Sequence, residues 1–291
     1  MTKDIVSIQR NVHVIPLEKE QEFLLLSDLH WDNPKCDQVL LTRHLEEAKN
    51  KNAMIIINGD ALCLMQGKFD PRGSKKDVRP EHSTGNYLDL VISTFVDFLT
   101  PYAHLIAVIG YGNHETNIIK RLETDPLQRV VDLLNSKCKS NIHTGGYGGW
   151  IVFKYEHSGA RNSYRMKYYH GSGGGGPVTK NTIGHQRLDA MIDSADCIWV
   201  GHTHDSWDMT VRKETLSQNY TTKQMDVLHI QSASYKDEYA DGGSGWHVER
   251  GAPPKPIGGY WLTLDPQVIT VAEKGKKYLK IHARAVRTDY R

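Results

Sequence analysis

Short apolar runs that end directly in Asp, Asn or His recur along this chain of 291 residues. The run Cys197-Ile198-Trp199-Val200, for example, leads into Gly201-His202-Thr203-His204. Continuous apolar runs of about four to eight residues are typical of strands that are buried on both faces. Such strands occur in parallel sheets that are covered by helices, so the pattern predicts an α/β fold.

The order of the expected elements supports this prediction. Amphipathic helices alternate with the buried strands in the first half of the chain, and strand patterns dominate from Ile142 onward. One of these helices is expected to bend near Pro126. Strands are expected at 5–17, 23–26, 53–57, 105–109, 150–155, 164–169, 197–200, 209–211, 225–230, 260–264 and 278–286, and helices at 39–50, 87–99, 118–134 and 186–192.

Length and composition narrow the class of protein. A chain with 39% hydrophobic residues can bury a large core, and no linker divides it, so we expect one domain over 1–291 with insertion loops near 66–86 and 232–259. The net charge of +2 is too small to create a strongly positive electrostatic field over the whole molecule, so the overall charge does not indicate a nucleic acid partner. Without a signal peptide, a membrane span or paired cysteines, the sequence suggests a cytoplasmic protein that makes no contact with membrane.

The polar residues at the strand tips suggest a metal site. In open α/β sheets, ligands bind beyond the carboxyl ends of the strands. A mixture of carboxylate, amide and imidazole suits Mn²⁺, Fe²⁺ or Zn²⁺, and seven such groups are about right for two ions rather than for one tetrahedral ion. The seven candidate ligands are Asp28, His30, Asp60, Asn113, His170, His202 and His204.

In this order, the motifs resemble those of the calcineurin-like binuclear metallophosphoesterase superfamily. They are Asp-x-His from Asp28, Gly-Asp at Asp60, Gly-Asn-His-Glu ending at Glu115, His-Gly at His170 and Gly-His-x-His ending at His204, and they cover about two thirds of the chain. The resemblance implies an αββα fold, in which helices flank a sandwich of two β-sheets. It also implies that the chain is a metal-dependent phosphoric ester hydrolase.

The resemblance also implies a role for each residue. Asp28, His30 and His204 would hold the first metal ion, and Asp60 would bridge the two ions. A hydroxide between the ions would attack phosphorus, and His114 would protonate the leaving alkoxide. The remaining ligands would hold the second ion, namely Asn113, His170 and His202.

Cys63 departs from the family pattern, because many members have an acidic residue there that orients the catalytic histidine. We therefore expect Glu115, or a residue outside the motifs, to orient His114. The residues after Asp60 also lack the Asp-Arg-Gly continuation of the protein serine/threonine phosphatases. The wording of the motifs is closer to the nuclease and nucleotide-phosphodiesterase branches.

Three functions follow from these observations. The first is hydrolysis of a phosphodiester, with a nucleotide or nucleic acid as substrate. The second is a phosphomonoesterase, including a phosphoprotein phosphatase, because the same metal core serves both reactions. The third is a metal-binding scaffold without catalysis, and Cys63 is the only feature that supports it.

Three further segments of the sequence each allow two interpretations, one structural and one functional. The glycines at 171–176 either let the chain turn beside the metals or present backbone N–H groups to a phosphate. The basic stretch 274–291 fits an edge strand protected by lysines, and also fits a surface that tracks a phosphate backbone. The charged loop 66–86 is either solvated or in contact with phosphate. His247 lies outside the motifs, in an aromatic and basic loop, and its role is left open.

Overall fold

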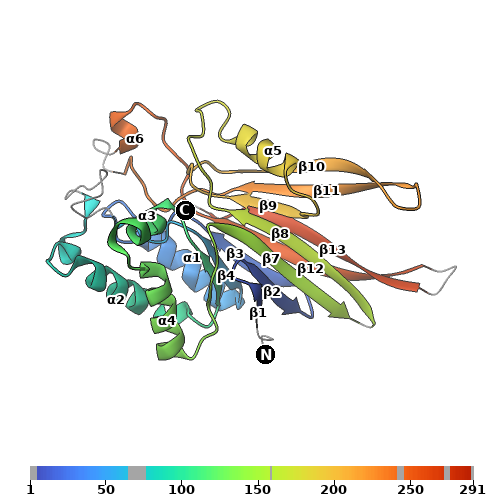
Figure 1. Ribbon diagram of the computed structural model, residues 1–291, viewed down its shortest axis with the longest axis horizontal. Coiled ribbons are helices and arrows are strands. Elements are labelled where there is room, and N and C mark those ends of the chain that lie inside the picture. The colour runs from blue at the N-terminus through green and yellow to red at the C-terminus, as the bar shows by residue number, and fades with distance from the viewer. Residues whose placement is uncertain (1–4, 65–76, 158, 241–245, 272–275, 290–291) are drawn as a thin grey trace.

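Two β-sheets form the centre of the molecule (Figure 1). The structure, a computed structural model, describes residues 5–64, 77–157, 159–240, 246–271 and 276–289. The seven-stranded sheet has the order β1 (Val6–Gln9), β2 (Val12–Leu17), β7 (Gly148–His157), β8 (Ala160–Tyr169), β9 (Cys197–Val200), β11 (Thr222–Gln231) and β10 (Trp207–Leu216). The six-stranded sheet has the order β13 (Lys276–Arg287), β12 (Tyr260–Val271), β3 (Gln21–Leu26), β4 (Met54–Asn58), β5 (Ile106–Gly110) and β6 (His143–Thr144).

Both sheets are mixed. Neighbouring strands run parallel from β3 to β6 in the six-stranded sheet, and β8, β9 and β11 are parallel in the seven-stranded sheet. The strands β2 and β7 also run parallel. All other neighbouring pairs named above are antiparallel. The predicted α/β class with two sheets and flanking helices is therefore confirmed.

The apolar runs are continuous because both faces of their strands are buried. In β3, Phe23 and Leu25 point into the core between the two sheets, where the Phe23 and Phe153 rings lie 4.5 Å apart. Leu24 and Leu26 point to the other side, where they pack against the helices. This alternation follows from the two-residue period of a strand.

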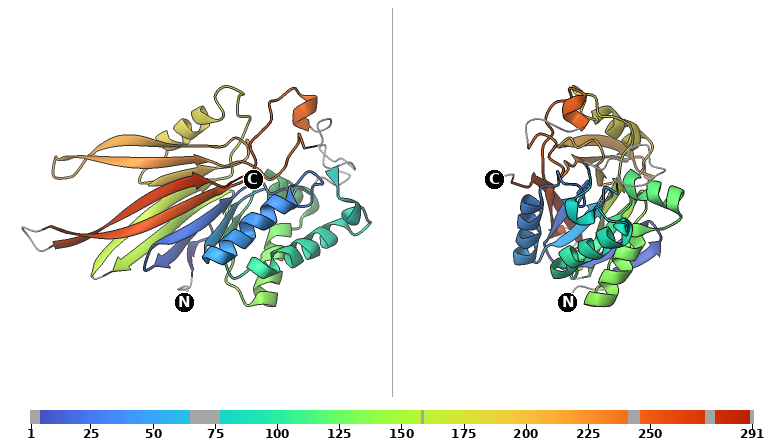
Figure 2. Two further views of the ribbon diagram at one scale, coloured as in Figure 1. Left: turned by 180° about the vertical axis from the view of Figure 1, so that it is seen from behind. Right: turned by 90° about the vertical axis from the view of Figure 1, so that its left-hand side faces the viewer.

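The helices lie outside the sandwich (Figure 2). The first four cover the six-stranded sheet, and α5 packs against the other sheet through Leu188 beside Ile198 and Val200. Within the described residues, no helix is both long and apolar enough to cross a membrane. The helices are α1 (Gln38–Lys51), α2 (Tyr87–Leu99), α3 (Asn113–Leu122), α4 (Pro126–Cys138), α5 (Thr182–Ala190) and the short α6 (Trp246–Glu249), with 3₁₀ turns η2 (Pro80–His82) and η3 (Thr100–Tyr102).

Two expectations about elements need correction. The single helix expected at 118–134 is two helices, because Glu123 adopts a left-handed conformation that ends α3, and the Asp125 side chain caps α4 ahead of Pro126. The strand expected at 5–17 is the hairpin of β1 and β2. Much of the expected loop 66–86 and both ends of the basic stretch 274–291 lie outside the described residues, whereas β13 is an edge strand as expected.

Candidate metal centre

The carboxyl ends of five strands meet at one edge of the sandwich. Strands β3, β4 and β5 are adjacent and parallel, as are β8 and β9 in the other sheet. Backbone bonds join neighbouring tips: the Asp28 N–H donates to the Gly59 carbonyl at 3.0 Å, and the Gly201 N–H donates to the His170 carbonyl at 3.0 Å. The two sheets are joined where the His202 N–H donates to Asp28 Oδ2 at 2.8 Å. All seven predicted ligands follow these tips.

Asp28, His30 and His204 form the first group of ligand atoms. Nε2 of His204 lies 3.4 Å from Nε2 of His30 and 3.4 Å from Oδ1 of Asp28, and the latter two atoms are 4.0 Å apart. Ligands at about 2.1 Å from one tetrahedral ion lie about 3.4 Å from one another. The spacing therefore suits a single ion, and these are the three residues predicted for the first metal.

Asp60, His170 and His202 form the second group. His170 Nε2 lies 3.2 Å from Asp60 Oδ2 and 3.2 Å from Asn113 Oδ1, so the predicted amide ligand also faces this group. The His170 and His202 rings meet edge to face at 5.2 Å. His170 Nδ1 donates to the Asn58 carbonyl at 3.0 Å, and this bond leaves Nε2 to face the carboxylates.

Asp28 Oδ1 lies between the two groups. It is buried and has imidazole nitrogens around it at 3.4 to 4.0 Å, which is longer than an ordinary hydrogen bond. A buried carboxylate oxygen in such surroundings fits a cation. The bridging role predicted for Asp60 stays a prediction, since Asp60 Oδ2 lies beside His170 and 3.8 Å from His114 Nε2.

The charges in the site also suit divalent ions. Burial lowers the pKa of His30 well below its ordinary value, and the neighbouring His114 lowers it further, so His30 is a neutral imidazole with a free lone pair. Burial alone would raise the pKa of Asp60, but His170 and His114 outweigh it and hold that pKa well below the usual range. His170 is the counterpart: the carboxylates of Asp60 and Asp28 overcome its burial and raise its pKa to about 10. A metal ion would compete with this proton.

Five of the seven candidate ligands have a left-handed backbone. Left-handed φ is uncommon outside glycine, although Asp, Asn and His tolerate it best, and it concentrates at functional sites. The strand tips are also crowded, since a Cβ atom at Gly201 would clash with Ser27 Oγ. The five residues are Asp28 (53°), His30 (46°), Asp60 (48°), His202 (69°) and His204 (57°).

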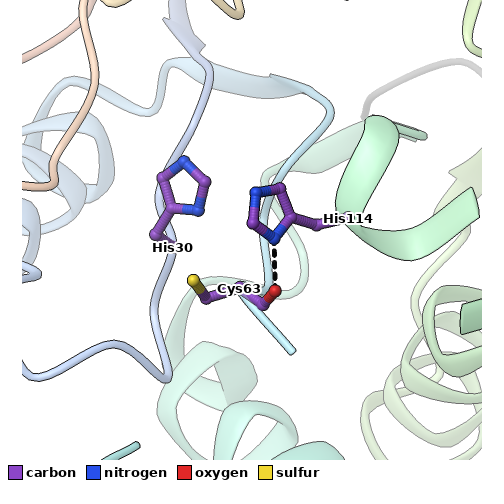
Figure 3. A group of neighbouring side chains, drawn as sticks. All are labelled: His30, Cys63 and His114. Atoms are coloured by element: carbon purple, nitrogen blue, oxygen red, sulfur yellow. Dashed lines mark hydrogen bonds between the residues drawn. The ribbon is translucent and has the colours of Figure 1, made fainter. Parts of the chain in front are cut away.

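His114 stands beside the ligand groups at the start of α3 (Figure 3). Its Nδ1–H donates to the backbone carbonyl of Cys63, and its ring meets the His30 ring edge to face at 4.8 Å. A carbonyl oxygen only accepts hydrogen bonds, so this bond places a proton on Nδ1 and turns Nε2 toward Asp60. At position 63, a backbone carbonyl rather than an acidic side chain therefore meets the histidine.

Glu115 lies behind the site and is fully buried. Its carboxylate accepts the backbone N–H groups of Asp60 at 3.2 Å, Leu62 at 3.0 Å and Gly112 at 2.9 Å. Burial and the charge of Asp60 raise the pKa of Glu115 to about 8. These bonds tie the tips of β4 and β5 together, so Glu115 positions the loops, and a direct catalytic role for it stays a prediction.

Two neighbours of the site, Asp32 and His247, were not predicted from the sequence as parts of it. Asp32 is buried and binds the loop after Asp60, and its only signal in the sequence is its place two residues after His30. His247, to which the sequence assigns no role, lies beside the first group, with its ring 5.7 Å from that of His204. The backbone N–H of His247 donates to Glu238 Oε2 at 3.1 Å, and Glu238 pairs with Lys236 at 2.6 Å.

Comparison with known proteins gives few matches. No protein-family model matches the chain, and no curated protein does. Among solved structures, the chain is similar to GAP50, the anchor in the inner membrane complex of Plasmodium, with 12% identity over 94% of this chain and 90% of that one, at a TM-score of 0.40. It is also similar to the Thermotoga maritima protein TM1076, with 12% identity over 91% of this chain and 99% of that one, at a TM-score of 0.32. At these scores, neither likeness supports a function.

Proposed function

We propose that this chain is a binuclear metal-dependent phosphoesterase with the αββα fold of the calcineurin-like superfamily. The observation that supports the proposal most is the convergence of two adjacent groups of buried and partly buried ligand atoms, with Asp28 Oδ1 between them. We further propose that the substrate is a phosphodiester, either a nucleotide or a nucleic acid. The motif wording at Ser27-Asp28-Leu29-His30 and after Asp60 supports this choice of substrate.

In this proposal, two groups of residues bind the metal ions and His114 donates the proton. Two divalent ions, when bound, lower the pKa of water and neutralise charge on the phosphoryl group. The first group of ligands and the second would each hold one ion. His114 presents Nε2 to the site and is 13% exposed at its side chain, so it reaches both the site and the solvent. His114 acts as the acid in its imidazolium form, with one proton on Nδ1 toward the Cys63 carbonyl and a second on Nε2. As the bond from phosphorus to the leaving oxygen breaks, the Nε2 proton passes to that oxygen and leaves the neutral ring with its proton on Nδ1.

The test is hydrolysis of bis-p-nitrophenyl phosphate and p-nitrophenyl phosphate by the Mn²⁺-loaded protein. We expect turnover with preference for the diester. Preference for the monoester or for a phosphopeptide would indicate the second function, a phosphomonoesterase. Turnover of neither ester by a protein that holds two ions would exclude catalysis and leave the scaffold.

Asp60→Asn is the informative variant. It keeps the shape of the side chain but removes the charge that attracts both ions, so kcat/KM should fall at least about a thousandfold, or about 4 kcal/mol. Asp125→Asn is the matched control, because Asp125 is also a bonded carboxylate but caps α4. Equal activity of the two variants would contradict the role of Asp60.

A further inference from the structure

The loop after Asp60 is held by two buried carboxylates. Glu115 accepts the N–H groups of Asp60 and Leu62, as described above. Asp32 takes the next two: its Oδ1 accepts the N–H of Cys63, and its Oδ2 accepts the N–H of Leu64 at 2.9 Å. The whole turn is therefore fixed by side chains from other parts of the chain.

Asp32 has the contacts of an ionised carboxylate. It is completely buried, and its third partner is the hydroxyl of Tyr87, which donates to Oδ2 at 2.8 Å. All three partners are donors, and an ionised carboxylate is an acceptor at both oxygens. The turn needs such support, because Leu64 has a left-handed φ of 51°.

The bond between Asp32 and Leu64 reaches His114 through a single peptide group. The N–H of Leu64 and the carbonyl of Cys63 belong to the same peptide unit. Asp32 accepts the hydrogen bond from the N–H end of that unit. At the carbonyl end, the oxygen of Cys63 accepts the hydrogen bond from His114 Nδ1–H (Figure 3). Hydrogen bonds in such a chain polarise one another, so the carboxylate strengthens the carbonyl as an acceptor.

We propose that Asp32 is the positioning residue for His114 and acts through the peptide group between Cys63 and Leu64. This arrangement supplies the orienting acid that position 63 lacks. Asp32 touches neither substrate nor metal ligand atoms in this scheme. It keeps the carbonyl of Cys63 aimed at Nδ1, and thereby keeps Nε2 of His114 aimed at the leaving group. The proposal rests on the proposed function for its catalytic consequence.

The choice of leaving group separates positioning of His114 from a general structural role. A p-nitrophenolate ion leaves without a proton, whereas the more basic phenolate of diphenyl phosphate benefits from a general acid. Asp32→Asn places an amide against backbone N–H groups, so one of them loses its acceptor. We expect kcat/KM for diphenyl phosphate to fall about tenfold to a hundredfold, and that for bis-p-nitrophenyl phosphate to change at most about twofold.

Three further variants complete the test. His114→Ala should show the same selectivity, and Asp32→Asn should add nothing in its presence, because both act on one group. Asp37→Asn is the matched control, since Asp37 accepts the Leu40 N–H at the start of α1, and it should leave both substrates unaffected. If Asp32→Asn fails to fold, Tyr87→Phe removes one donor from Asp32, and it should cause a smaller loss with the same selectivity.

A second measurement is independent of activity. At a pH where the ring is neutral, histidine ¹⁵N resonances of the Zn²⁺-loaded protein report which ring nitrogen of His114 carries the single proton. We expect Nδ1–H in the wild type and a mixture of tautomers in Asp32→Asn. An unchanged tautomer, or equal losses on both diesters, overturns the proposal. If the wild type hydrolyses neither diester, the proposed function fails, and the tautomer still decides whether Asp32 positions His114.

Discussion

At the scale of the residue, several candidate metal ligands of the site have a strained, left-handed backbone conformation. Left-handed φ values at Asp28, Asp60 and His202 turn the chain sharply at three strand tips, so that side chains from different strands reach a common point. Each such residue costs of the order of 1 kcal/mol or more. Hydrogen bonds at the strand tips offset this strain, for example those that the backbone N–H groups of His202 and Asp60 donate to Asp28 and Glu115.

His202 and His204 are two residues apart but belong to different groups of ligands. His204→Ala should therefore weaken the ion at Asp28 and His30, and His202→Ala the ion at Asp60 and His170. Each variant should retain about one Mn²⁺ per chain after dialysis, as measured by elemental analysis, because loss of a ligand costs at least about a hundredfold in affinity.

Electron paramagnetic resonance provides the second readout for these two variants. The wild type with two Mn²⁺ ions should show a coupled spectrum, and each variant the spectrum of an isolated ion. His104→Ala is the control, since His104 is exposed and lies outside both groups. Loss of both ions in each variant would contradict the assignment to separate metals.

At the scale of the element, the sequence predicted the buried strands well, because a strand such as β4 is apolar on both faces and ends in Asn58-Gly59-Asp60. It also predicted that the Asp, Asn and His residues after these strands come together, since residues that follow parallel neighbouring strands lie at one edge, whereas their role as metal ligands stays a prediction. It did not predict the break between α3 and α4, although Asp125-Pro126 is a helix-start signal. The bond from Asp32 to Leu64 spans 32 residues, and a local pattern cannot show such a contact.

A pair of histidines, His13 buried and His143 partly buried, links strands of the two sheets. His13 on β2 and His143 on β6 each meet Ser7 Oγ, at 2.8 Å and 3.1 Å. Burial, together with the neighbouring His143, lowers the pKa of His13 from 6.5 to about 4. As the pH falls below 6.5, the unfolded chain binds a proton at this position, and the folded chain does so only near pH 4. Stability contributed by neutral His13 is thus present above pH 6.5 and is lost between 6.5 and about 4.

The free energy of unfolding should consequently fall between pH 7 and pH 5, by about 2 kcal/mol from this residue. Urea unfolding at the two pH values measures it. His13→Gln should be less dependent on pH by that amount, because glutamine binds no proton. Parallel pH dependence in the two proteins would show that the pKa of His13 is the same in the folded and the unfolded chain.

At the scale of the whole molecule, both groups of ligands join the two sheets. In the first group, Asp28 and His30 follow a strand of the six-stranded sheet, and His204 follows a strand of the other. In the second group, Asp60 comes from the six-stranded sheet, and His170 and His202 come from the seven-stranded sheet. Separation of the sheets would therefore break both groups, so the unfolded chain cannot offer these sites.

Ions that bind only the folded chain should stabilise the sandwich as a unit. At Mn²⁺ a hundredfold above Kd, one site adds about 2.7 kcal/mol to the free energy of unfolding. Scanning calorimetry should show Tm rising with Mn²⁺ and returning to its starting value after chelation. Asp60→Asn, which weakens the second group, should lose a large part of the increment, whereas Asp125→Asn should keep it. If Mn²⁺ raised Tm equally in both variants, the ions that stabilise the chain would be bound elsewhere than at the second group.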